Sequence, residues 1–182
     1  MMTLKNIFTC LLFITISAEA QKSYTLADAG SKVHFVIKNF GINTGGDFTG
    51  LTGNISFFPE NLTASRFNVS VSASSVDTDN SMRDKNLAGN EYFDAAKFPL
   101  IKIVSVKIEK TNKTADGYYY FTGNLTIKGI TKAVAFPFQA KKVDNGYLFT
   151  GNFEIDRTDF GVGEKNIVLS NKVAVTLSVT AK

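Results

Sequence analysis

YYYFTGNLTIKGITKAVAFPFQAKKVDNGYLFTGNFEID, residues 118–156, alternates apolar and polar side chains over most of its length. Successive side chains of a β-strand point to opposite faces, so a period of two predicts strands with one apolar face. Two tight-turn signals, Lys128-Gly129 and Asp144-Asn145-Gly146, interrupt the alternation. Turns of this kind join neighbouring antiparallel strands. The stretch therefore predicts an antiparallel meander with strands near 117–128, 131–142 and 146–156.

The same alternation extends outward from this meander in both directions. Val173, Val175 and Leu177 share one face of a C-terminal strand, and Val33, Phe35 and Ile37 share one face near the N-terminus. The further strands are predicted at 23–28, 32–40, 45–58, 65–76, 100–111 and 171–181. The fold class is therefore all-β, with about eight strands that either pack as two sheets or close into an up-and-down barrel.

Residues 75–99, SVDTDNSMRDKNLAGNEYFDAAKFP, are the exception to the alternation. Ser81 followed by Asp84 fits a capping box, in which Ser81 is the N-cap and Asp84 reaches back to it. Gly89 is a natural helix stop. We expect one or two short helices between the strands, near residues 79–97, and we expect this segment to cover one end of the strand assembly.

The first twenty residues have the features of an export signal. Lys5 precedes the ten-residue apolar run Ile7–Ile16, and Ala18-Glu19-Ala20 fits a cleavage site. A membrane-spanning helix needs about 20 apolar residues, so the run is too short to span. We predict a signal peptide at 1–20, a single domain at 21–182, and a periplasmic or secreted location. A buried N-terminal helix is the alternative.

The residue composition limits the kinds of metal, catalytic and nucleic-acid-binding site that the chain can form. The chain has one histidine, His34, and one cysteine, Cys10, which lies in the predicted signal peptide. Cysteine-based and multi-histidine metal sites are therefore excluded from the mature chain. His34 lies on the polar face of its strand, which favours a surface or hydrogen-bonded histidine over a catalytic base. The net charge of +4 comes from scattered lysines. We therefore expect no nucleic-acid partner and allow a transient contact with a membrane surface.

Two pairs of aspartates raise the alternative of an enzyme. Asp77 with Asp79, and Asp156 with Asp159, could supply the two carboxyl groups of a glycoside hydrolase. Both pairs lie where a predicted strand ends, however, and aspartate there commonly bonds its own nearby backbone. The turn interpretation is favoured, so we expect no catalytic residues.

Several short motifs resemble those of the YceI-like family of secreted bacterial proteins. Each is weak alone, but they occur in the same order over nearly the whole predicted mature chain. The motifs are Tyr24 to Leu26 with Ser31, Val33-x-Phe35, Gly46-x-Phe48-x-Gly50, Ser75 to Thr78, Arg83-Asp84-x-x-Leu87, Tyr92-Phe93-Asp94, Phe98-Pro99, the run Gly123 to Lys132, and Asp156-Arg157-x-Asp159-Phe160-Gly161.

This resemblance implies an antiparallel up-and-down lipocalin-like barrel. It also implies an exported, non-enzymatic protein without a cofactor, which holds a polyisoprenoid or similar long amphiphile, such as an isoprenyl lipid or a quinone, in a tubular apolar cavity for storage or transport. Gly30 and Asn39 stand where the family often has histidine, a departure that bears on the choice of lipid head group. The identity of the lipid and the oligomeric state, a homodimer included, stay open.

The inward strand faces give the candidate binding residues. The apolar side chains expected to line or back the cavity are Phe35, Ile37, Phe48, Phe67, Val69, Phe121, Leu125, Phe136, Phe149, Phe153, Val175 and Leu177. The polar candidates for contact with a head group, or for fixing loops, are Asn39, Arg83, Asp84, Arg157 and Asp159. Arginine suits phosphate, but the nearby aspartates favour arginine–aspartate pairs that fix loops. The alternative to a carrier is a barrel with a filled core, acting as an envelope stress or adhesion module.

Overall fold

The computed structural model describes residues 23–111 and 116–182. The predicted signal peptide lies outside these residues. The described strands are β1 Ser23–Asn39, β2 Ile42–Phe48, β3 Thr52–Ser56, β4 Arg66–Ser72, β5 Leu100–Lys110, β6 Tyr118–Ile127, β7 Ile130–Val143, β8 Gly146–Asp156 and β9 Leu169–Ala181. The helix α1 spans Ser81–Ala88, and 3-10 turns occur at Leu62–Ala64, Ala73–Ser75 and Arg157–Phe160. Within the described residues, no helix has the length and apolar character to cross a membrane.

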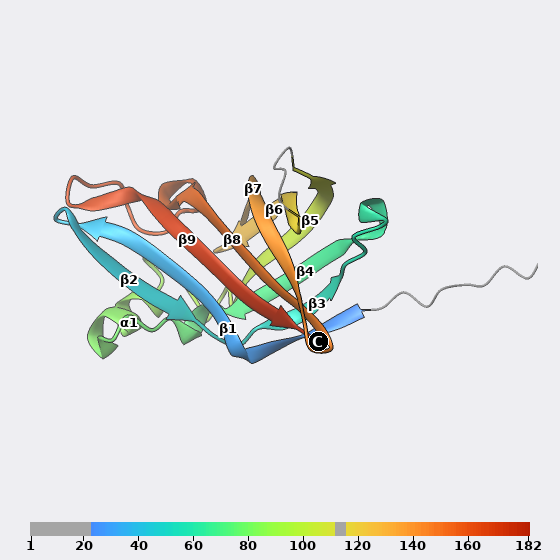
Figure 1. The fold of residues 1–182 in the computed structure, drawn as a ribbon. Helices are drawn as coiled ribbons and strands as arrows, with labels where there is room; N and C mark the ends of the chain where they lie inside the picture. Colours follow the sequence, from blue (N-terminus) through green and yellow to red (C-terminus); the bar gives the residue numbers. More distant parts are fainter. Residues whose placement is uncertain (1–22, 112–115) are drawn as a thin grey trace, which may run out of the picture.

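The strands close into an antiparallel barrel. From β3 to β9 each strand pairs with the next along the chain, and β1 pairs with both β3 and β9. The last strand thus meets the first, as Figure 1 shows for β9 beside β1. β2 is an additional strand that pairs with β1 alone among the described strands. The predicted up-and-down barrel is confirmed.

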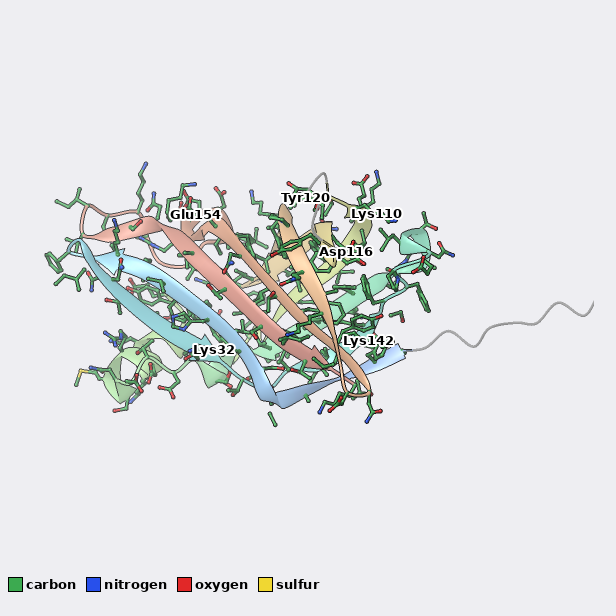
Figure 2. All side chains as sticks on the ribbon, in the orientation of Figure 1. Lys32, Lys110, Asp116, Tyr120, Lys142 and Glu154 are labelled. Carbon is green, nitrogen blue, oxygen red and sulfur yellow. The ribbon has the colours of Figure 1, made fainter. Side chains whose placement is uncertain are left out.

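The alternation along the strands explains which face is buried. Phe121 is buried on β6, whereas its neighbour Tyr120 is exposed, and Lys32 is exposed beside Val33. Figure 2 labels Lys32, Tyr120 and the exposed Glu154 among side chains of the outer surface. Because the strands keep this period of two apart from irregularities in β1 and β5, the apolar faces converge inside the barrel.

Two predicted strand boundaries differ from the structure. The segments 23–28 and 32–40 form one long strand, β1, with an irregularity in its pairing to β9 between Ala27 and Lys32. The segment 45–58 is interrupted between β2 and β3, where Gly50 has a positive φ of 72°. The carboxylate of Asp28 accepts hydrogen bonds from the backbone N–H groups of Gly50 and Leu51, at 3.1 and 2.7 Å. The irregularity in β1 therefore stabilises the kink that separates β2 from β3.

One end of the barrel, called the closed end here, is filled by aromatic side chains. Phe57, which directly follows β3, has 2% of its surface exposed. Its ring packs edge-on against five neighbouring rings, which belong to Phe67, Tyr119, Phe138, Tyr147 and Phe149. Edge-to-face packing of this kind stabilises aromatic clusters beyond the area that they bury. Burial also raises the pKa of Tyr119 and Tyr147 above the ordinary value for tyrosine.

The other end, called the open end here, is covered in part by residues 76–99, which contain α1 (Figure 1). We call these residues the α1 segment. Its first residues extend the sheet, because the backbones of Asp77 and Asp47 exchange hydrogen bonds of 2.8 and 3.0 Å beside β2. A Cβ atom on Gly46 would lie 2.7 Å from the Thr78 side chain and 2.8 Å from the Asp77 carbonyl oxygen. The glycine therefore permits this close approach of the α1 segment to β2.

The predicted capping box of α1 is wrong by one residue. The N-cap is Asn80, whose side-chain oxygen accepts a hydrogen bond from the Arg83 N–H at 3.0 Å. The carboxylate of Asp84 turns away from the helix end and accepts hydrogen bonds from the backbone N–H and the hydroxyl of Thr78. Thr78 competes for that carboxylate because the approach to the helix folds back over the first turn. The predicted stop at Gly89 is confirmed; residues 90–93 and 95–97 form turns in place of a second helix.

Candidate ligand-binding cavity

The barrel encloses a cavity of about 850 Å³ between the aromatic closed end and the α1 segment. Small-molecule sites commonly have volumes of about 300–1,000 Å³. The cavity reaches the surface at the open end, where the exposed residues Met82, Lys85 and Asn90 contribute to its lining. The stress or adhesion alternative requires a barrel core that is filled throughout. The cavity contradicts this between the closed end and the α1 segment.

All of the apolar residues singled out from the sequence lie in the cavity lining. They come from β1, β2, β4, β6, β7, β8 and β9, and they are Phe35, Ile37, Phe48, Phe67, Val69, Phe121, Leu125, Phe136, Phe149, Phe153, Val175 and Leu177. The structure brings them together, and a direct contact with a ligand stays a prediction. Phe67, Phe121, Phe136 and Phe149 belong to the aromatic cluster, so they form the floor of the cavity.

The sequence-based selection missed other parts of the lining. Ile101 and Ile103 of β5, Ile127 of β6 and Val173 of β9 share faces with chosen residues or with each other, so the same alternation could have found them. Tyr92, Phe93 and Leu87 of the α1 segment also contribute. Phe93 packs edge-on against Phe48, with ring centroids 5.4 Å apart. No strand period marks these last three, because they lie outside the strands.

The polar candidates divide into two groups. Asn39, Arg83 and Arg157 lie in the lining, whereas Asp84 and Asp159 do not. Of the two positions where histidine is frequent in the family, Asn39 lies at the cavity and Gly30 does not. Gly30 lies in the irregular part of β1, where its carbonyl accepts a hydrogen bond from Thr180. The three polar candidates in the lining therefore lie at the open end, at the end of β1, in the α1 segment and after β8.

Arg157 is a buried cation bonded to backbone carbonyls. Its guanidinium donates to the carbonyl oxygens of Ser170, Val162, Glu164 and Leu169, at 2.9, 2.7, 2.9 and 3.3 Å. These carbonyls belong to the loop between β8 and β9 and to the start of β9. The predicted pairing of Arg157 with Asp159 is wrong: the loop folds its own carbonyls around the guanidinium, while Asp159 is exposed. Arg157 thus fixes the loop that forms one side of the open end.

Arg83 is only partly buried, and it contacts Asp84 through an intermediary. Its Nε donates to the Thr78 hydroxyl at 2.7 Å, and its Nη2 donates to the Thr78 carbonyl at 2.6 Å. The same hydroxyl donates to Asp84, so Thr78 separates the two charged groups. Arginine carries five N–H donors in a planar fork. Thr78 accounts for two of the Arg83 donors, and the side chain also lines the cavity.

The aspartates proposed as catalytic pairs serve as turn and cap residues. Asp77 Oδ1 accepts the backbone N–H of Asp79 at 3.0 Å, and Asp156 Oδ1 accepts the backbone N–H of Thr158 at 3.0 Å. The additional hydrogen bond from the Thr158 hydroxyl is the main cause that lowers the pKa of Asp156. The turn interpretation is confirmed for Asp77 and Asp156.

His34 is half-buried and has the hydrogen bond that was expected, with its Nδ1 2.7 Å from Asp47 Oδ1. In the described parts of the chain, no group of three or more potential metal ligands comes together.

Curated relatives with similar sequences extend over most of this chain. The protein YceI of Salmonella agona is 35% identical over 76% of this chain and 71% of its own. A UPF0312 protein of Yersinia pestis is 31% identical over 97% of this chain and 95% of its own.

Solved structures share the barrel. BcnA of Burkholderia cenocepacia superposes with a TM-score of 0.79 at 26% identity, over 86% of this chain and 99% of its own. A polyisoprenoid binding domain of Saccharophagus degradans superposes with a TM-score of 0.71 over 87% of this chain and 97% of its own; at 14% identity this likeness concerns the fold alone. The YceI-like domain family matches residues 24–181. The chain therefore belongs to the YceI-like domain family.

Proposed function

We propose that this protein is an exported, non-enzymatic carrier that holds a polyisoprenoid lipid or a prenyl quinone in its barrel, for storage or transport. The observation that carries the proposal is the apolar cavity of about 850 Å³, closed by aromatic rings at one end and reaching the surface at the other. Membership of the YceI-like family and a polyisoprenoid binding domain with the same fold support the choice of ligand. The predicted signal sequence supports export.

The ligand tail would point toward the closed end and its head toward the open end. Each CH₂ group transferred from water to an apolar site contributes about 0.8 kcal/mol, so a long prenyl tail needs few polar contacts. A polar head buried without hydrogen bonds costs free energy, and the polar lining residues Asn39, Thr44 and Arg83 lie toward the α1 segment. Arg83 has donors left for a head group, which makes it the strongest polar candidate.

The proposal is tested by identifying a bound lipid and by measuring the uptake of an added one. Protein purified from its native host without detergent is extracted with organic solvent, and the extract is analysed by mass spectrometry. Uptake of an added prenyl quinone from dilute solution is measured in parallel. We expect a prenyl lipid in the extract or saturable uptake of the quinone. A clean extract together with no uptake contradicts the proposal.

A matched pair of variants locates the ligand. Val175 lines the cavity, whereas its neighbour Thr176 is exposed on the outer face of β9. Val175→Phe is expected to fill part of the cavity and to reduce quinone uptake. Thr176→Phe adds the same ring outside the barrel and should leave uptake unchanged. Equal uptake by both variants would place the ligand outside the barrel.

A further inference from the structure

Four large apolar side chains are exposed at the open end. The exposed fractions are 77% for Phe40, 71% for Ile42 and 76% for Met82, and Ile167 is fully exposed. We call these four side chains the apolar rim. The Phe40 N–H donates to the Val168 carbonyl at 3.0 Å, which joins the β1–β2 hairpin to the loop before β9. Figure 1 shows this hairpin, that loop and α1 at the same end of the barrel.

The apolar rim is continuous with the cavity lining. Asn39 pairs with Leu169 of β9, and both residues line the cavity. Ile42 lies opposite Asn39 in the β1–β2 ladder, and directly opposed residues share one face of a sheet. Ile42 therefore extends the inward face beyond the mouth. Met82 is itself part of the lining. A ligand leaving the cavity at this end therefore meets apolar side chains first.

The backbone conformation of Phe40 is unusual for a phenylalanine, which indicates a functional role for its exposed side chain. Phe40 and Gly41 form a two-residue hairpin turn with positive φ values of 50° and 77°. Such turns favour Asn-Gly or Gly-Gly, and a bulky residue at positive φ is an outlier. The ring is mostly exposed, so packing inside the protein does not compensate for the strain. Strained residues of this kind concentrate at functional sites.

The charges beside the apolar rim indicate its partner. The segments 38–42, 81–85 and 164–168, which carry the rim, contain the cations Lys38, Arg83, Lys85 and Lys165 and the anions Asp84 and Glu164. The three lysines are exposed. Apolar side chains flanked by lysine are the combination that binds the interface of an anionic bilayer, where the apolar groups enter the acyl boundary and the cations meet the head groups.

We propose that the apolar rim docks onto an anionic phospholipid bilayer, so that the cavity mouth faces the acyl region during loading and release. The inference rests on the proposed function, because it gives the cavity a route to its ligand that avoids water. It adds the partner surface, the residues that enter it and the end of the barrel that faces the membrane.

The test measures binding to vesicles by co-flotation. The vesicles are pure phosphatidylcholine, or phosphatidylcholine mixed with phosphatidylglycerol. The variants are Phe40→Asn, Ile167→Ser and the double variant, and the matched control is Val106→Ser. Val106 is 65% exposed on β5, away from the apolar rim. Its neighbour Ser105 accepts a hydrogen bond from the backbone N–H of Phe67, which belongs to the aromatic cluster of the closed end. Uptake of a prenyl quinone without vesicles is measured separately, so that a failure of the proposed function is distinguished from a failure of docking.

The wild type and Val106→Ser are expected to bind the mixed vesicles more tightly than the pure phosphatidylcholine vesicles. Each single variant is expected to bind them about tenfold more weakly, and the double variant about a hundredfold more weakly, because each side chain entering the acyl boundary is worth about a factor of ten. Phe40→Asn should keep or raise the melting temperature, since Asn-Gly suits the turn. Lost binding in a variant of unchanged stability therefore reports docking and not folding.

Three results would overturn the docking proposal. The first is a wild type that binds neither kind of vesicle. The second is a double variant that binds as well as the wild type. The third is a concentration-dependent dimer that Phe40→Asn dissociates, without vesicle binding, which would assign the apolar rim to a second copy of this chain.

Discussion

Arg157 has 4% of its surface exposed, and carbonyl oxygens surround its guanidinium. A buried charge costs much free energy unless it is well hydrogen-bonded. Two of the carbonyls, those of Val162 and Glu164, belong to the β8–β9 loop, and two, those of Leu169 and Ser170, belong to the start of β9. A Cβ atom on Gly163 would lie 3.0 Å from Arg157 Nη1 and 2.8 Å from the Tyr92 ring. The arginine therefore organises the β8–β9 loop and supports the packing of that loop on the α1 segment.

Removing this guanidinium should be costly. Arg157→Leu is expected to lower the free energy of unfolding by about 3 kcal/mol or more, because several carbonyls lose their partner in a buried place. Denaturant unfolding measures the change. The matched control is Arg66→Leu, since Arg66 also donates to two backbone carbonyls but is exposed; its cost should stay below about 1 kcal/mol. Equal costs for the two variants would contradict the structural role of Arg157.

Among elements, the α1 segment depends on contacts with distant turns. The Lys128 ammonium group, in the β6–β7 turn, donates to the carbonyl oxygens of Glu91 and Gly161, at 3.0 and 2.8 Å. The Gly163 N–H donates to the same Glu91 carbonyl at 3.0 Å. One lysine thus connects the α1 segment, the β6–β7 turn and the β8–β9 loop. These few hydrogen bonds hold the three segments together as one cover over the open end of the barrel.

Lys128→Asn isolates this connection. Lys128 has a positive φ of 49° and precedes Gly129, so asparagine suits the turn while it removes the ammonium group. Losing hydrogen bonds to a charged donor should weaken the local structure by about 1–1.4 kcal/mol. Amide hydrogen exchange within residues 89–93 and at Gly163 should then become about five- to tenfold faster, with little change in global stability.

The control for this change is Lys142→Asn. Lys142 is exposed near the β7–β8 turn, well away from the α1 segment (Figure 2). Exchange in residues 89–93 should match the wild type in this variant. Unchanged exchange in Lys128→Asn as well would show that the cover does not depend on the lysine.

For the whole molecule, local patterns predicted the strands, and non-local pairings decided what they enclose. The alternation around Phe121, Phe149 and Val175 placed these side chains inside correctly, because strand geometry alone sets the face. The pairing of β1 with β9 joins residues far apart in sequence, so periodicity left two sheets and a barrel as alternatives. The partners of Arg83 and Arg157 were missed for a different reason. Adjacent aspartates looked suitable, but the guanidinium groups bond to backbone carbonyls such as those of Thr78 and Val162, five residues away, and strand periodicity does not describe these irregular segments.

Phe57 shows how one residue directly after a strand shapes the interior. The predicted strand 45–58 contains it, and it continues the inward face of Ile55, but the alternation does not reveal its partners. Its ring joins the aromatic side chains of β4, β6, β7 and β8 at the closed end. Without this ring the floor of the cavity would lose its central contact. A cavity closed at one end sets an upper limit on the length of chain that it holds.

Phe57→Ala should therefore change both stability and ligand length. Removing a buried phenylalanine ring costs about 3–5 kcal/mol, which unfolding experiments would register. A quinone bound in the barrel should then reach further into the deeper cavity, so Phe57→Ala should favour longer prenyl tails over shorter ones. Competition between quinones of different tail length measures this preference. Tyr120→Ala, at an exposed ring on the outer face of β6, controls for the loss of an aromatic side chain. An unchanged length preference in a folded Phe57→Ala protein would show that the closed end does not limit the ligand.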